Sequence, residues 1–116
     1  MEIIYTKENL ELFKKFLDSN DNIKHYYNEY KDNLKEFFEK EVQIHINVYF
    51  QRINYRKRYF FIIETFYEFY SSDDIELNVM KDYNTALNKA INYIFTNILN
   101  VVKVWNIMMK HNVLGR

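Results

Sequence analysis

The sequence contains no cysteine, no proline and a single glycine, Gly115. Without cysteine the chain has no disulfide framework, no thiol nucleophile and no thiolate zinc site, and it is compatible with a reducing compartment. The near absence of glycine excludes the tight loops that hold phosphate groups in P-loop and dinucleotide-binding folds. Serine occurs only at positions 19, 71 and 72, and none lies in the small-residue turn of a serine hydrolase. We therefore expect no cofactor.

Long apolar runs are missing as well. The longest uninterrupted one covers residues 59–63, whereas a membrane-spanning helix needs about 20 apolar residues. The apolar run at residues 3–5 follows an acidic residue and is shorter than the core of a secretion signal. These features predict a soluble, cytoplasmic protein without a membrane partner.

Apolar side chains are nevertheless abundant. Of the 116 residues, 48% are hydrophobic and 19% are aromatic, so the chain has enough apolar surface to build a core. Its length suits one core and not two. We expect residues 1–116 to form a single small globular domain.

Apolar residues recur every three or four positions in two stretches before residue 42. This spacing predicts a helix over residues 7–18, with Thr6 as its N-cap. It also predicts one continuous second helix over residues 23–38, with Asp21 or Asn22 as the N-cap.

The period changes to two just past residue 41. Residues 42–51 alternate between apolar and polar, which predicts a half-buried strand, and the polar stretch 52–58 then turns the chain. Residues 59–70 fit a helical face or a strand, but ten of the twelve are aromatic or β-branched, which favours an antiparallel strand. Residues 71–74 predict a turn, and residues 75–80 a short third strand.

A long helix is predicted to close the chain. Asp82 or Asn84 is its N-cap, and helical spacing of apolar residues continues to about His111. Nine of the twelve residues from 98 to 109 are apolar, so this part is covered by the first two helices or forms a homodimer surface. The candidate dimer face consists of Val101, Val104, Trp105, Met108 and Met109.

The predicted fold class is therefore α+β. Two N-terminal helices precede a three-stranded antiparallel meander, and a long C-terminal helix follows it. The alternative is an all-helical bundle in which residues 42–70 form one more helix.

Charge is balanced overall but uneven along the chain. The formal net charge is zero, while residues 48–64 carry four basic side chains and one acidic one. Guanidinium groups pair with phosphates, and aromatic rings offer faces on which unstacked bases can lie, so this segment is the best candidate for an RNA site. It equally fits a solvated hairpin tip or a surface that docks on an acidic protein. The cluster comprises Arg52, Tyr55, Arg56, Lys57 and Arg58.

Catalytic chemistry has little support in the sequence. The three histidines lie far apart, without the spacing of a metal site. Glu64 and Glu68 lie among aromatic residues, where a carboxyl group can act as a general acid or base, but cross-strand ion pairs with Arg52, Arg56 or Arg58 are the simpler explanation. An enzyme would need Glu64 to be buried in a polar-lined pocket, so we expect no catalytic or metal-binding residues.

The sequence thus favours a small non-enzymatic protein that binds another protein and blocks or regulates it. Its size and AT-rich coding bias are typical of phage or mobile-element regulators, immunity proteins and inhibitors of defence systems. Tyrosine and arginine are common interface anchors. The candidate partner-binding residues are Tyr26, Tyr27, Tyr30, Arg52, Tyr55, Arg56, Lys57 and Arg58.

Residues 80–91 read Met-Lys-Asp-Tyr-Asn-Thr-Ala-Leu-Asn-Lys-Ala-Ile. This stretch resembles the last strand-to-helix junction of ribosome hibernation-promoting factors, and a short β segment at the N-terminus would complete a similar order of elements. The resemblance implies a βαβββα fold related to double-stranded-RNA-binding domains. It makes an RNA- or ribosome-associated factor the alternative function, with the 52–58 tip and the lysines at 89, 103 and 110 as the contact surface.

Overall fold

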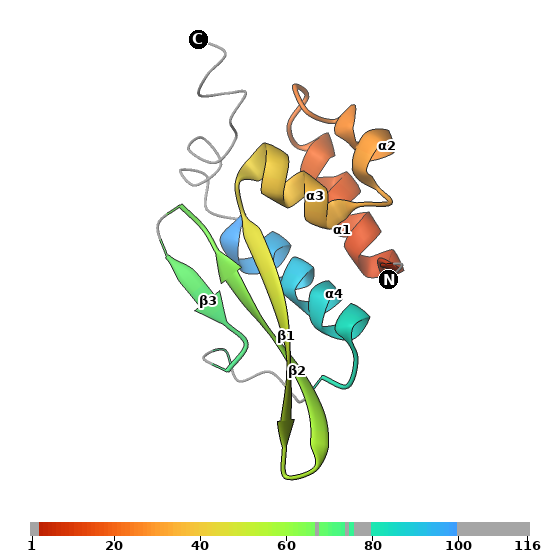
Figure 1. Cartoon of the computed structure of the whole chain (residues 1–116). Coiled ribbons are helices and arrows are strands. Elements are labelled where there is room, and N and C mark those ends of the chain that lie inside the picture. The colour runs from red at the N-terminus through yellow and green to blue at the C-terminus, as the bar shows by residue number, and fades with distance from the viewer. Residues whose placement is uncertain (1–2, 67, 74, 76–79, 100–116) are drawn as a thin grey trace.

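A computed structural model describes residues 3–66, 68–73, 75 and 80–99. In this part of the chain, helices cover one face of a three-stranded antiparallel sheet with strand order β1-β2-β3 (Figure 1). The α+β prediction is confirmed, and the all-helical alternative is wrong. The strands are β1 (His45–Ile53), β2 (Arg56–Glu64) and β3 (Phe69–Ser71). The helices are α1 (Lys7–Asp18), α2 (Tyr26–Tyr30), α3 (Leu34–Phe37) and α4 (Tyr83–Tyr93), with π-helical turns η1 (Phe38–Val42) and η2 (Ile94–Ile98).

The first helix is as predicted. The hydroxyl of Thr6 accepts a hydrogen bond from the N–H of Asn9 at 3.2 Å and so caps α1. Residues 3–6 are not part of a strand, so the β segment expected at the N-terminus is absent from the described residues.

The prediction of one continuous second helix is wrong, because the helix is interrupted between α2 and α3. Asn33 has a φ of −148°, and its side-chain oxygen accepts a hydrogen bond from the N–H of Glu36 at 3.2 Å. Short polar side chains favour such local bonds over helix interiors. The apolar spacing runs unchanged across the break, which is why periodicity conceals it.

The first strand begins three residues later than predicted. Val42 belongs to η1, and the N–H of Ile44 donates to the carbonyl of Phe38 at 2.8 Å to close that turn. The alternation is correct from there on, since Ile44 and Ile46 are buried while His45 is exposed.

The segment predicted as one strand over residues 59–70 contains a turn. The hydroxyl of Thr65 accepts a hydrogen bond from the N–H of Glu68 at 3.1 Å and donates to the carbonyl of Glu68 at 2.6 Å. The chain therefore reverses, and β3 pairs back on β2. A third strand exists, but it lies earlier than the predicted 75–80 segment, of which residues 76–79 are not described. Met80 forms an isolated antiparallel bridge with Tyr59.

The helix after the sheet begins as predicted. The carboxylate of Asp82 accepts a hydrogen bond from the N–H of Thr85 at 2.7 Å, and this bond lowers the pKa of Asp82. The predicted continuation of the helix lies outside the described residues, as does the proposed dimer face of Val101, Val104, Trp105, Met108 and Met109. None of the described helices is both long and apolar enough to cross a membrane.

The core lies between the inner face of the sheet and the helices. Phe38 is fully buried, and its ring centroid lies 5.1 Å from that of Phe95. The ring of Phe13 on α1 lies 4.9 Å from that of Phe37. The inner face of β2 adds Phe61 to this core. These rings make the helices and the strand ends beneath them one packed body.

A buried pair of amides joins α1 to α4. The side-chain NH₂ of Asn9 donates to the side-chain oxygen of Asn88 at 2.6 Å and to its backbone carbonyl at 3.0 Å. The NH₂ of Asn88 donates to the carbonyls of Ile4 and Asn84, at 2.9 and 2.8 Å. The oxygen of Asn88 also accepts the N–H of Thr6 at 2.9 Å. We call this network the asparagine clasp; it fixes the N-terminal segment on the body.

Candidate binding arm at the end of the sheet

The β1–β2 hairpin extends beyond the helices that cover the rest of the sheet (Figure 1). We call residues 49–60 the arm. Three of its aromatic residues are strongly exposed: Tyr49 by 41%, Phe50 by 50% and Tyr55 by 98%. The arm therefore presents apolar rings that the core of the described chain does not use.

Aromatic pairs line both faces of the arm. On the outer face, the rings of Tyr49 and Phe60 lie 5.2 Å apart, and on the inner face those of Phe50 and Tyr59 lie 5.3 Å apart. Each pair joins directly opposite residues of the two strands. Cross-strand aromatic pairs stabilise a hairpin by a fraction of a kcal/mol up to about 1 kcal/mol. The arm is thus held together by its own side chains.

The tip is a two-residue turn at Asn54 and Tyr55, whose φ angles are 52° and 66°. Two positive φ angles are the signature of a type I′ turn, which prefers asparagine and then glycine. Asparagine fits the first position, but a tyrosine in the left-handed region costs roughly 1–2 kcal/mol. Since Tyr55 is almost fully exposed, packing within the described chain does not offset this cost.

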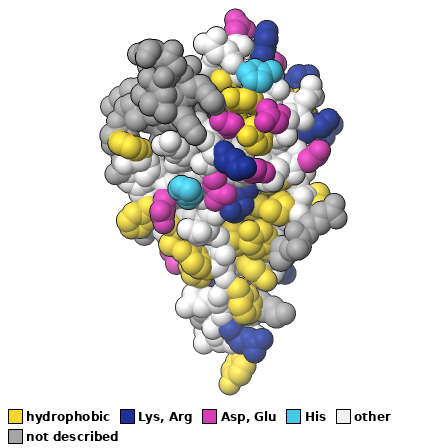
Figure 2. All heavy atoms as spheres, turned by 45° about the horizontal axis from the view of Figure 1, so that its top comes forward, with side chains coloured by type: hydrophobic (Ala, Val, Ile, Leu, Met, Phe, Trp, Pro, Cys, Tyr) yellow, Lys and Arg dark blue, Asp and Glu magenta, His cyan; other side chains and the backbone are white. Residues whose placement is uncertain are grey.

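Basic residues surround this tip. Arg52 is exposed and lies opposite Lys57, while Ile53 lies opposite Arg56. The guanidinium group of Arg58 pairs with the carboxylate of Asp73 at 2.6 Å. Figure 2 shows hydrophobic side chains along this tapering end and basic ones near its tip, whereas acidic side chains gather farther up the molecule. The five residues predicted from the basic-aromatic cluster therefore come together at the arm.

The three tyrosines predicted alongside them do not join this surface. They belong to the helical layer, at the other end of the molecule from the hairpin tip (Figure 1). The ring of Tyr27 lies 5.6 Å from that of Phe13, and the ring of Tyr30 lies 5.6 Å from that of Phe37. Tyr26 packs edge-on against Tyr30, with centroids 5.8 Å apart. These contacts give the three tyrosines a packing role in the described structure.

Tyr30 is the most constrained of the three. Its side chain is buried, and its hydroxyl donates to the carboxylate of Glu41 at 2.8 Å. Burial and the neighbouring carboxylate both disfavour a phenolate, so the pKa of Tyr30 is raised above its usual value.

This raised pKa predicts a loss of stability at alkaline pH. The contribution of Tyr30 is fully present below pH 10, the pKa of an unfolded tyrosine, and is lost as the pH rises toward the folded value. Above pH 10 the free energy of unfolding of the wild type should fall by about 1.4 kcal/mol more per pH unit than that of Tyr30→Phe. Urea titrations at several pH values measure this difference. Tyr55→Phe is the control, and an equal effect there would contradict the assignment to Tyr30.

The opposite end of the sheet carries a different surface. An open hollow of about 780 Å³ lies between the helices and the strand ends. Glu64, which the sequence pattern singled out, is one of its lining residues and is exposed. Among the described residues, no group of three or more histidine or acidic side chains is placed to hold a metal ion. The lining comprises Tyr26, Glu29, Glu39, Lys40, Glu41, Gln43, His45, Glu64, Thr65 and Phe66.

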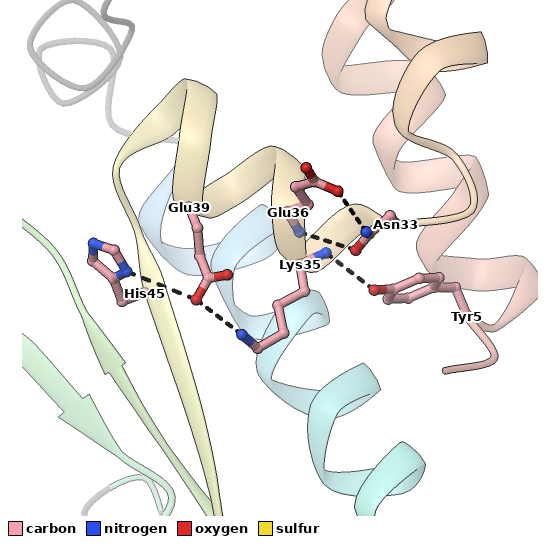
Figure 3. A network of polar contacts seen from close by, with 6 residues as sticks. All are labelled: Tyr5, Asn33, Lys35, Glu36, Glu39 and His45. Atoms are coloured by element: carbon pink, nitrogen blue, oxygen red, sulfur yellow. Dashed lines mark hydrogen bonds and ion pairs between the residues drawn. The ribbon is translucent and has the colours of Figure 1, made fainter. Parts of the chain in front are cut away.

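A polar network beside this hollow joins the helical layer to the start of β1. The carboxylate of Glu39 forms an ion pair with the ammonium group of Lys35 at 2.9 Å. It also lies 3.7 Å from a ring nitrogen of His45 (Figure 3). The backbone N–H of Lys35 donates to the hydroxyl of Tyr5 at 3.1 Å. The network thus links the N-terminal segment, the helical layer and the first residue of β1.

The outer face of the sheet carries apolar side chains beyond the arm. Phe66 and Phe69 are 68% and 65% exposed, and together with Ile62 they border a shallow hollow of about 370 Å³. The sequence pattern placed Ile62, Phe66 and Phe69 in one predicted strand over residues 59–70 and did not identify which face of the sheet stays uncovered. The alternation was the available signal, but it does not reveal on which side of a sheet the helices pack.

Comparison with known proteins finds no matching protein-family model, no matching curated protein and no matching solved structure. The functional interpretation therefore depends on the chemistry of the arm.

Proposed function

We propose that this chain is a small non-enzymatic protein that binds a partner protein through the arm and thereby blocks or regulates it. Regulators and inhibitors of the phage or mobile-element type fit this description. The arm supplies aromatic and arginine side chains, which are the residue types most enriched at interface hot spots.

The observation that carries the proposal is the conformation of Tyr55. A large aromatic side chain occupies a turn position that favours glycine, and it is 98% exposed. Backbone strain of this kind clusters at active sites, ligand clamps and switch regions. The described chain gains no packing from the ring, so a partner that covers the ring is the proposed reason for its presence.

The arm also indicates the chemistry of its partner. A two-stranded ribbon with rings on both faces fits a recess with apolar walls. The basic residues that follow the turn favour acidic groups at the bottom of that recess. The arm holds its shape through the paired rings of Tyr49 with Phe60 and of Phe50 with Tyr59, which limits the conformational entropy lost on binding.

A photo-crosslinking amino acid at position 55 tests the proposal in cells that naturally make the protein. We expect one discrete adduct consisting of this chain and one other protein. The matched control places the same amino acid at Lys14, an exposed position of α1. Excess wild-type protein should compete the adduct away, whereas excess Arg52→Glu should not.

Two results would count against the proposal. Equal adducts from positions 55 and 14 would show that the arm has no preference for a partner. No adduct at position 55 would show that the ring is not covered in the cell.

An RNA partner is the second candidate, and the separation of charge favours it. The basic residues of the tip lie at the arm, while the carboxylates of Glu29, Glu39, Glu41 and Glu64, together with the single lysine Lys40, line the hollow at the other end of the sheet. Phosphates would therefore meet little repulsion at the tip. The same crosslinking experiment separates the two candidates, because ribonuclease would remove an RNA adduct and leave a protein adduct intact.

A further inference from the structure

β1 is an edge strand, because the strand order is β1-β2-β3. It pairs with β2 over nine consecutive residues without a bulge. Within the described part of the chain, α4 packs across both β1 and β2, and η1 meets only the beginning of β1. No backbone hydrogen bond in that part joins the other edge of β1 to a further element.

The register shows which residues of β1 direct their backbone N–H and C=O groups away from β2. The N–H of Tyr59 donates to the carbonyl of Met80 at 2.8 Å, on the side of β2 away from β1. Phe50, directly opposite Tyr59, therefore directs its N–H and C=O away from β2. The alternation of an antiparallel strand turns every second residue of β1 the same way. These outward residues are Ile46, Val48, Phe50 and Arg52.

This edge lacks the features that keep natural edge strands unpaired. β1 contains no proline, no glycine and no bulge, and Arg52 is its only Lys, Arg, Asp or Glu residue. Unpaired edges are usually protected by such residues or by being very short. The opposite edge of the sheet is protected in the second way, because β3 has only three residues.

We propose that β1 pairs antiparallel with β1 of a second copy of this chain, about a two-fold axis at Tyr49. The two sheets then join into one continuous sheet. Because both copies contribute the same edge, the contact closes at the dimer and does not propagate into a filament.

The register about Tyr49 is self-complementary. It places Val48 opposite the partner's Phe50 and Ile46 opposite the partner's Arg52, so all four outward residues of each copy find a strand partner. Moving the axis to Val48 or Phe50 leaves one of the four without a partner within β1. Outward groups left unpaired gain no hydrogen bond from the contact, so the axis at Tyr49 is favoured.

The side chains agree with this register. Asn47 lies opposite the partner's Gln51, where two amides can exchange hydrogen bonds, and Tyr49 lies beside the partner's Tyr49. The exposed ring of Phe50 gains an apolar neighbour. In this register position 55 falls level with position 43 of the partner, so each basic tip lies at the end of the joined sheet where the partner's η1 precedes β1. The proposal goes beyond the binding function of the arm and does not depend on it, because it rests on the unpaired edge of β1.

Phe50→Pro and Phe50→Ala test the proposal as a matched pair. Proline removes an outward N–H that is not part of the β1–β2 ladder, so the monomer can keep its fold. Alanine removes the same ring and keeps the N–H. By symmetry, proline removes two intermolecular hydrogen bonds, which should weaken dimerisation by roughly 30-fold relative to alanine. Light scattering across a concentration series should show a wild-type dimer with twice the chain mass of 14.5 kDa.

Hydrogen exchange in the wild type gives a second test that requires no variant. In a dimer, the amides of Val48 and Phe50 become as protected as those of Asn47 and Tyr49, and dilution removes only the protection of the first two. A wild type that is monomeric at all concentrations would overturn the proposal. A dimer in which Val48 and Phe50 exchange rapidly, or in which Phe50→Pro equals Phe50→Ala, would place the interface elsewhere, with the predicted last-helix face as the next candidate.

Discussion

Tyr55→Gly is expected to stabilise the protein and to weaken its binding to the partner protein. Glycine adopts the observed φ of 66° without steric cost and creates the Asn-Gly pair that type I′ turns prefer. The free energy of unfolding should rise by about 1 kcal/mol. Loss of the ring at a binding hot spot should cost about 2 to 4 kcal/mol, which weakens binding roughly 30- to 1,000-fold. Urea denaturation measures the change in stability. Calorimetric titration with the partner protein that crosslinking identifies measures the change in affinity.

Asn54→Gly is the matched control for this prediction. It also places glycine at a positive φ in the same turn, but it keeps the aromatic ring. Stability should change by only a few tenths of a kcal/mol, because asparagine already tolerates the left-handed region, and affinity should stay within about twofold. If Tyr55→Gly bound as tightly as the wild type, the ring would have no part in recognition. If it were destabilising, the turn would not have the conformation described.

The opposite signs of the two effects make this prediction informative. Most substitutions that weaken binding also leave stability unchanged or reduce it. A gain in stability with a loss of binding is the expected result where a strained residue serves function.

The first strand and the starts of two helices were predictable to within three residues, because local physics determines them. Alternation of apolar residues located β1, the aromatic and β-branched composition of residues 59–70 located most of β2, and the caps at Thr6 and Asp82 located the starts of α1 and α4. Such signals lie within a few residues of the feature that they predict.

The breaks were not predictable, because no glycine or proline marks them. Asn33 ends one helical segment and caps the next, and Thr65 turns the chain through bonds to Glu68. At both sites the side chain satisfies backbone groups that would otherwise belong to a longer helix or strand. The pattern of apolar residues continues through them, so periodicity alone predicts elements that are too long.

The candidate site was predictable in part. The basic-aromatic composition of residues 52–58 identified the tip, but the sequence left its loop length open. The two-residue turn and the left-handed Tyr55 emerged only when β1 and β2 were paired in register. Tyr26, Tyr27 and Tyr30 show the limit of composition, because a tyrosine that packs a core and one that binds a partner look alike in sequence.

Asn88→Ala is expected to be strongly destabilising, since it removes the centre of the asparagine clasp. The side chain of Asn88 accepts from Thr6 and Asn9 and donates to Ile4 and Asn84. A buried polar group that loses its partner costs about 1 to 3 kcal/mol. With several such groups left without a hydrogen-bond partner, the free energy of unfolding should fall by about 3 kcal/mol, and the Tm should fall by roughly 10 °C or more.

Asn92→Ala, one helical turn farther along α4, is the matched control. The side-chain oxygen of Asn92 has no hydrogen-bond partner within the described part of the chain, so its loss should cost less than about 1 kcal/mol. Equal destabilisation by both variants would show that the clasp adds nothing beyond helix packing. Below its Tm, Asn88→Ala should bind the partner protein as the wild type does, because the clasp lies in the body and not in the arm. Asn88→Ala should therefore lower stability and leave binding unchanged, whereas Tyr55→Gly should raise stability and weaken binding. This is the expected result if the body only positions the arm and the arm alone contacts the partner.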